Sequence, residues 1–306
     1  MPPPNRPVDK DGFPLPVTFD QTAKPRFAKP ANSAGQAVWV VRGLLVLACL
    51  GLLVGTALKG IGPDYIANWY LKRAEDRYLS DDLPGAIADL DRAIGWMPTA
   101  PELLEQRAYY RQKANDLSGS LEDYNRLIEM NSADPDAYSG RSTVYQRMER
   151  HREAIDDVTR ALELRPRSDH KLLNHRAYTR AIAGLELEEA LSDIQQAIDQ
   201  IHYEEAAYLD TRGYIYHLLG RHDEALKDLD RAVQLATLQR KRMLQLAAAR
   251  RQNRWRAKLE RSFNEIEAVM IYHRGLVHEK LGNSEQAEAD QQRGLELGYN
   301  PAEGVY

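Results

Sequence analysis

Residues 138–166 read YSGRSTVYQRMERHREAIDDVTRALELRP, a stretch that combines small residues with apolar residues at helical spacing. Ser142 and Ala154 are small, and Tyr145 and Val158 follow them three and four positions later. Spacings of three and four residues place side chains on one face of a helix. The stretch therefore predicts two short amphipathic helices, joined by a tight turn, that approach each other closely at the small residues.

The same pattern occurs six times after Pro63. In each copy an arginine precedes a small residue, and a second small residue follows twelve or thirteen positions later. The successive arginines are 34, 34, 35, 36 and 62 residues apart. The arginines are Arg73, Arg107, Arg141, Arg176, Arg212 and Arg274, and the second small residues are Ala86, Ser120, Ala154, Ala190, Ala225 and Ala287.

A 34-residue period with this pattern resembles the tetratricopeptide repeat (TPR) family over residues 67–300. The resemblance implies an all-α, right-handed superhelical solenoid of about six helix-turn-helix repeats, because no single helix pair can bury its own apolar face. It also implies a scaffold for protein–protein interactions. The chain departs from the family at the position before the first small residue, where arginine replaces leucine in every unit.

An aspartate recurs with each arginine, three residues after the second small position. A ladder of catalytic or ligand-binding charges is one interpretation, and a ladder of structural arginine–carboxylate bridges is the other. Because the pair occurs in every unit, it belongs to the scaffold, and we predict structural bridges. The aspartates are Asp89, Asp123, Asp157, Asp193, Asp228 and Asp290.

The N-terminal part of the chain differs from the repeats in composition. Residues 1–36 contain eight prolines and no apolar period, which predicts a disordered tail. Residues 37–58 are apolar apart from Arg42, and about 20 such residues span a bilayer. We therefore expect a single transmembrane helix over 37–59. Residues 60–66 would be a short linker, 67–239 repeats one to five, 240–267 a helical insert, 268–300 repeat six and 301–306 a tail.

The side of the membrane is decided by weak evidence. Basic residues flank both ends of the apolar segment in nearly equal number, so the positive-inside rule does not choose an orientation. Moving a charged tail of this length across a membrane is the less common route. We therefore expect the tail inside the cytoplasm and the repeats outside it.

Motifs for catalysis or metal binding are missing from the sequence. Cys49 is the single cysteine, so disulfides and thiolate zinc sites are excluded. The histidine pairs His217/His222 and His273/His278 are five residues apart, which puts their side chains on different faces of a helix. No phosphate-binding glycine loop or nucleophile–base motif is present. We expect no enzymatic activity, no metal and no cofactor.

The family resemblance also suggests where a partner binds. In TPR proteins the first helix of each unit lines a concave groove that accepts an extended peptide or a partner helix. Tyrosines and polar neighbours suit such a groove, because tyrosine offers contact area at low entropic cost. Packing of these tyrosines between helices is the alternative. By position, the groove residues are Tyr109, Gln112, Thr143, Gln146, Asn174, Tyr178, Asp210, Tyr214, His217 and Tyr272.

The insert, residues 240–267, carries nine basic and three acidic residues in an otherwise acidic repeat region. The insert contains no Gly or Pro, so we expect the helices on either side to continue into it and the chain to reverse near 251–253. The apolar side chains expected to face each other across the two helices are Leu238, Leu246, Leu259 and Phe263. The insert could bind an anionic lipid or an acidic partner, or its arginines could simply balance the charge of the acidic repeats. Binding of nucleic acid is disfavoured, because Trp255 is the one aromatic residue nearby and the repeats are acidic. The basic residues of the insert include Arg240, Lys241, Arg242, Arg250, Arg251, Arg254, Arg256 and Lys258.

Two classes of function follow. The first is a membrane-anchored interaction scaffold that binds peptide segments or partner proteins, with a chaperone-like role or a role in assembling envelope or secretion complexes. The second is a self-assembling structural protein of the membrane surface, in which acidic and basic faces of copies of this chain associate. The expected partners are proteins or peptides, together with the lipid bilayer around residues 37–58.

Overall fold

The computed structural model describes residues 62–165, 167, 169–249 and 253–299, and within these ranges the chain forms twelve α-helices and no strand. The predicted tail (1–36) and transmembrane helix (37–59) lie outside the described residues, as do the last residues of the chain. No helix in the ranges that are described is both long and apolar enough to cross a membrane.

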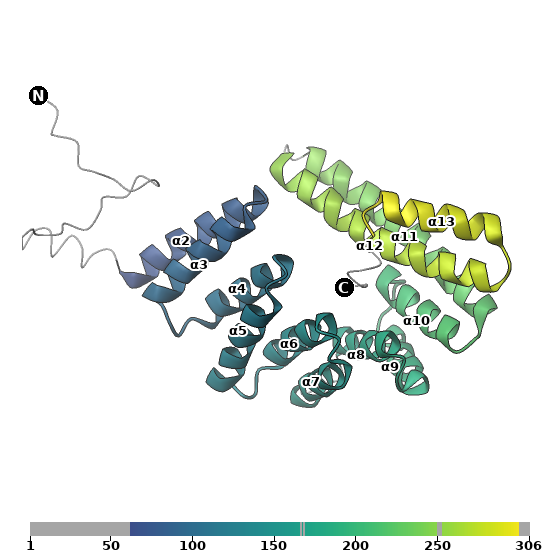
Figure 1. Ribbon diagram of the computed structural model, residues 1–306, viewed down its shortest axis with the longest axis horizontal. Coiled ribbons are helices and arrows are strands. Elements are labelled where there is room, and N and C mark those ends of the chain that lie inside the picture. Colours follow the sequence, from purple (N-terminus) through teal and green to yellow (C-terminus); the bar gives the residue numbers. More distant parts are fainter. Residues whose placement is uncertain (1–61, 166, 168, 250–252, 300–306) are drawn as a thin grey trace, which may run out of the picture. The chain divides into compact units, whose positions relative to one another are not determined.

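The helices form six consecutive antiparallel pairs (Figure 1). Most are 13 or 14 residues long, as the repeat pattern predicts. The pairs are α2 (Pro63–Leu79) with α3 (Leu83–Trp96), α4 (Pro101–Lys113) with α5 (Leu117–Met130), α6 (Pro135–Arg147) with α7 (His151–Leu164), α8 (His170–Ala183) with α9 (Leu187–Asp199), α10 (Ala206–Leu218) with α11 (His222–Ala249), and α12 (Asn253–Lys280) with α13 (Ser284–Glu296).

Aspartates start several of these helices. The side chain of Asp82 accepts a hydrogen bond from the backbone N–H of Gly85, and Asp116 does the same for Gly119, each at 3.0 Å. Such N-caps satisfy backbone donors that the first helical turn leaves without partners. Local sequence therefore fixes where these second helices begin.

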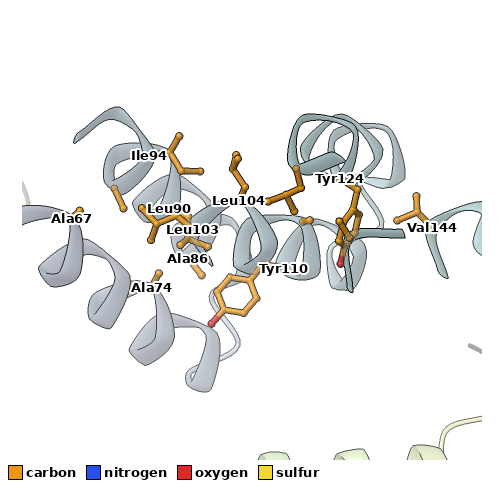
Figure 2. Close-up of a cluster of buried hydrophobic side chains, with 14 residues drawn as sticks. Ala67, Ala74, Ala86, Leu90, Ile94, Leu103, Leu104, Tyr110, Tyr124 and Val144 are labelled. Carbon is orange, nitrogen blue, oxygen red and sulfur yellow. The ribbon is translucent and has the colours of Figure 1, made fainter. Parts of the chain in front are cut away.

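Small residues bring the two helices of a pair together. Ala74 and Ala86 are fully buried where α2 meets α3, and Leu90, Leu104 and Tyr110 fill the space towards the next pair (Figure 2). The contact is close in the fifth pair, where a Cβ at Gly213 would lie 2.7 Å from Leu229 Cγ. The alanine and glycine positions of the repeat are thus the places where backbones approach most closely.

The predicted arginine–aspartate bridges are present in all six pairs. Each arginine uses Nε and Nη2 to donate to the two oxygens of its aspartate, with Nε–Oδ2 distances of 2.7–3.0 Å and Nη2–Oδ1 distances of 2.5–2.9 Å. The aspartates are at most 9% exposed. Bidentate geometry and burial make these structural bridges, which confirms the scaffold interpretation.

The turn within each pair places at least one residue in the left-handed region of backbone conformation, and the turn of the fourth pair places two there, Gly184 and Glu186. Glycine takes this position in the fifth and sixth pairs, at Gly220 and Gly282. The first three pairs use Asp81, Asn115 and Glu149 instead, with φ of +60°, +62° and +58°. Glycine adopts this conformation without steric cost, whereas other residues pay for it. The turn itself therefore does not require an aspartate at this position.

The helices of the insert are twice as long as the others. α11 and α12 contain 28 residues each, so both helices continue into the insert as the unbroken helical pattern predicts. One detail of that prediction is wrong: Leu238 and Leu246 are 61% and 45% exposed rather than packed between the helices. Ala236 and Ala247 are buried instead, because they lie on the face of α11 that meets α12.

Candidate peptide-binding surface

The first helices of the six pairs (α2, α4, α6, α8, α10 and α12), here called the inner row, carry all the predicted groove residues. Figure 1 shows α4 and α6 on the inner side of the array and their partners α5 and α7 on its outer side. Side-chain contacts link several neighbouring helices of the row, and they differ in chemistry along its length. The surface is therefore described below from the first pair to the last.

The first end of the inner row is aromatic. Tyr78 of α2 stacks on Tyr110 of α4 with ring centroids 4.4 Å apart, and its hydroxyl lies 3.2 Å from the hydroxyl of Tyr109. Tyr110 is buried, whereas Tyr109 is 40% exposed. Burial raises the pKa of Tyr110 to about 12, so the phenol stays neutral. Tyr109 is thus the part of this cluster that a partner reaches from solvent.

The middle of the inner row is polar. The side-chain amide of Gln146 on α6 donates to the hydroxyl of Thr179 on α8, and His175 Nδ1 lies 3.1 Å from Ser139 Oγ. Asn174, one residue before His175, has a buried side-chain oxygen with no hydrogen-bond partner among the described residues. That oxygen is enclosed by the fold, so it is not accessible to a partner in this conformation.

The far end of the inner row combines histidines with tyrosines. His273 Nδ1 lies 2.9 Å from Asp210 Oδ1, and both residues are buried between α12 and α10. Tyr214 stacks on His273 with centroids 4.2 Å apart, and Tyr272 stacks on Tyr299 at 4.1 Å. Burial raises the pKa of Tyr214. Tyr214 is therefore part of the packing between two repeats as well as of the surface.

The structure sorts the ten predicted groove residues by exposure. Gln112, Gln146 and Asp210 are buried, so they support the surface from below rather than offer side chains to solvent. Tyr109 is exposed. The half-buried residues are Thr143, Asn174, Tyr178, Tyr214, His217 and Tyr272.

Two histidines of the inner row predict a pH dependence of stability. Burial lowers the pKa of His175 and of His217 to about 4. The unfolded chain therefore binds more protons between about pH 6.5 and pH 4, so the stabilisation is present above pH 6.5 and is lost as the pH falls towards 4. Urea denaturation at pH 7 and pH 5 should show a larger loss for the wild type than for H175Q/H217Q. Equal losses would contradict the assignment.

The basic insert divides into paired and solvent-facing residues. Arg240 lies 2.9 Å from the buried carboxylate of Glu267, whereas Lys241, Arg242 and Arg256 are exposed. Lys258 contacts the first repeat, as discussed below. The side chains of Arg250, Arg251 and Arg254 lie outside the described part. A cavity of about 370 Å³ lies between the two helices, lined by Thr237, Arg240, Lys241, Leu244, Gln245, Ala248 and Arg256.

Sequence reasoning missed several residues of the inner row. Tyr78, Tyr110, His175 and His273 all make cross-helix contacts, but none was among the predicted groove residues. A signal was available for two of them, since His175 and His273 directly follow the predicted Asn174 and Tyr272. A small rotation of a helix about its axis brings the next residue along the chain onto the face that meets the neighbouring helix. The spacing of residues in the sequence does not reveal that rotation.

Comparisons with known proteins support the repeat pattern. The profile of the family described as "Tetratricopeptide repeat" matches residues 135–168, 203–237 and 268–297. These segments coincide with the third, fifth and sixth helix pairs. Three of the six helix pairs thus match the tetratricopeptide repeat profile. No relative among the curated proteins matches this sequence.

Two solved structures share the arrangement of helices. The type IV pilus biogenesis factor PilW superposes with a TM-score of 0.55 at 14% identity, over 77% of this chain and 95% of PilW. A tetratricopeptide repeat protein from Parabacteroides merdae superposes with a TM-score of 0.50 at 15% identity, over 77% of this chain and 94% of that protein. At such identities the likeness concerns the arrangement of helices alone.

Proposed function

We propose that this chain is a protein-interaction scaffold whose inner row binds segments of partner proteins. The observation that carries the proposal is the row of tyrosine, asparagine and threonine side chains that crosses successive repeats on α4, α6 and α8. Tyr109 is exposed and Tyr178 is half-buried, so both offer aromatic area to a partner, and the half-buried side chains of Thr143 and Asn174 are polar.

The chemistry of the inner row favours a peptide over a small molecule. Aromatic side chains with adaptable polar neighbours recur in paratopes and at interface hot spots. Among the described residues no group of acidic, histidine or cysteine side chains is arranged to hold a metal ion. The neutral aromatic and amide groups bind through contact area and hydrogen bonds, with little demand for charge on the partner.

The test is to truncate the inner row and measure partner capture. N174A/Y178A should reduce the amount of co-purifying protein from membranes, quantified by mass spectrometry, while circular dichroism shows an unchanged melting temperature. Y203A is the matched control, because Tyr203 is 62% exposed and lies in the loop before α10. If N174A/Y178A retained every partner, the inner row would not be the binding surface.

The scaffold is tethered to a membrane in this proposal. Residues 37–58 supply the apolar length that a bilayer requires, and the repeats would lie outside the cytoplasm, close to the membrane surface. A scaffold in that place would gather envelope or secreted proteins. PilW, which shares the arrangement of helices, is a type IV pilus biogenesis factor. At 14% identity PilW supports this setting only by analogy of fold.

Deleting residues 37–58 provides the corresponding prediction. The shortened chain should move from the membrane pellet to the supernatant, since the apolar anchor is gone. Its circular dichroism spectrum should keep the helical signal of the repeats, because the repeats bury their apolar surface among themselves. A shortened chain that stays with membranes through a high-salt wash would contradict the anchor.

A further inference from the structure

The first and last helix pairs of the array touch each other through the insert. Lys258, near the start of α12, places Nζ 3.0 Å from the centroid of the Tyr78 ring and 2.5 Å from the backbone oxygen of Tyr78. One turn further on, Arg261 donates to both carboxylate oxygens of Asp81 at 2.9 and 3.1 Å. Figure 1 shows the beginning of α12 beside the turn between α2 and α3. The insert thus joins residues 180 positions apart.

Asp81 occupies the left-handed position of its turn, as Asn115 and Glu149 do in the next two pairs. It has the left-handed conformation (φ +60°) that Gly220 and Gly282 adopt in the fifth and sixth pairs. A glycine would satisfy the turn without steric cost. The Asp81 carboxylate accepts hydrogen bonds from Arg261, and its Oδ1 lies 3.8 Å from Lys258 Nζ. What distinguishes Asp81 from Asn115 and Glu149 is that its carboxylate contacts two cations of α12.

The contact lacks an apolar core. None of the clusters of buried apolar side chains among the described residues joins α2 to α12. Arg261 and Asp81 are more than half exposed, and ion pairs of that kind contribute little and weaken with salt. Lys258 is the better-shielded cation, at 20% side-chain exposure. A contact made of a cation–π pair, one hydrogen bond from Lys258 to the Tyr78 backbone and one exposed ion pair can open without unfolding either repeat.

We propose that the turn of the first repeat, formed by Tyr78 and Asp81, is a docking site for a basic helix, and that α12 occupies it in cis. A basic helical segment of a partner binds the same site when α12 leaves. The exchange opens the inner row, because α2 and α12 belong to its two ends. This inference rests on the proposed function only for the existence of a partner.

The chemistry of the site explains why the occupant is basic. The face of Tyr78 attracts an ammonium or guanidinium group, and the stacked Tyr110 holds the ring in place. The end of α2 and its turn also carry Glu75, Asp76, Asp81 and Asp82. An acidic or purely apolar helix would find no complementary groups there.

A peptide of residues 253–266 tests the docking site directly. Fluorescence anisotropy would measure its binding to the full-length protein and to K258Q/R261Q, in which the cis occupant has lost both cations. The variant should bind the peptide about tenfold more tightly than the wild type, which corresponds to removal of one cation–π competitor. A peptide that itself carries K258Q and R261Q should bind neither protein.

Asp81→Gly is the matched control at the site. Glycine suits the left-handed backbone, so the fold is retained while the carboxylate is lost. Adding D81G to K258Q/R261Q should weaken peptide binding again. Equal affinity of the wild type and K258Q/R261Q for the peptide, including no binding to either, would overturn the proposal.

A distance measurement tests the opening without any partner. Spin labels at cysteines replacing Glu75 and Ser262, both exposed, would report the separation of α2 and α12 in a C49S background. The wild type should give one narrow distance at low salt, and D81G or 1 M salt should lengthen and broaden it. An unchanged distribution in D81G would overturn the proposal, and its result is independent of whether the inner row binds a peptide.

Discussion

Arg141→Ala is expected to lower the free energy of unfolding by about 3–5 kcal/mol, because it leaves a buried carboxylate without its partner. Asp157 is 6% exposed, and among the described residues both its oxygens accept from Arg141, at 2.7 and 2.8 Å. In the other pairs a second arginine often reaches the aspartate, as Arg111 does for Asp123. In the third pair Arg141 is the one arginine shown bonding Asp157, so a single bridge can be measured there. Urea denaturation followed by circular dichroism gives the value.

Two comparisons separate the bridge from ordinary truncation. R141M/D157L removes both charges and keeps apolar volume, so it should recover most of the loss. Arg160→Ala removes an exposed arginine that bonds Glu163 one turn away on α7, and it should leave the free energy of unfolding nearly unchanged. If R141A were as stable as R160A, the ladder would be dispensable.

The ladder was predictable because it depends on contacts within one repeat. Arginine and aspartate recur sixteen or seventeen residues apart in every unit, and a repeated fold repeats the contact between them. The same reasoning gives the helix pairs themselves and the close approach at Ala86 and Gly213. Periodicity therefore supplies the local geometry of this chain with little need of tertiary information.

Contacts between distant repeats were not predictable in this way. The meeting of Lys258 with Tyr78 depends on how a small rotation at each repeat accumulates along the array, and no local pattern encodes that sum. The exposed positions of Leu238 and Leu246 have a related cause: the face of α11 that meets α12 is selected by alanines, not by the largest apolar side chains. The sequence therefore identified the helices that form the candidate site, but only some of the residues on them.

Burial also altered the functional interpretation of single residues. The spacing of Asp210 and Gln146 placed them on the first helices, where the resemblance to tetratricopeptide repeat proteins implies a groove. In the structure Asp210 bonds His273 and Gln146 bonds Thr179, so both side chains are committed within the protein. The spacing of residues predicts which face of a helix a side chain lies on. How deeply that side chain is buried depends on the size of the side chains around it.

Gly213→Ala is expected to destabilise the protein by about 1–2 kcal/mol, although alanine is the better helix former. The added Cβ would lie 2.7 Å from Leu229 Cγ and 3.2 Å from the backbone oxygen of Ala225. Leu229 is fully buried, and the α11 backbone cannot retreat without disturbing the neighbouring repeat. Overpacking should therefore exceed the gain from helix propensity, as guanidinium denaturation would measure.

Gly95→Ala is the matched control, with the opposite expected sign. Gly95 is exposed near the end of α3, and an added Cβ there would meet no atom within 4 Å. Only the propensity term remains, so this variant should gain up to about 1 kcal/mol. Two glycine-to-alanine changes in one protein would then shift stability in opposite directions, because one glycine holds two helices together and the other does not. A stabilised Gly213→Ala would show that the fifth pair tolerates a wider separation than its contacts indicate.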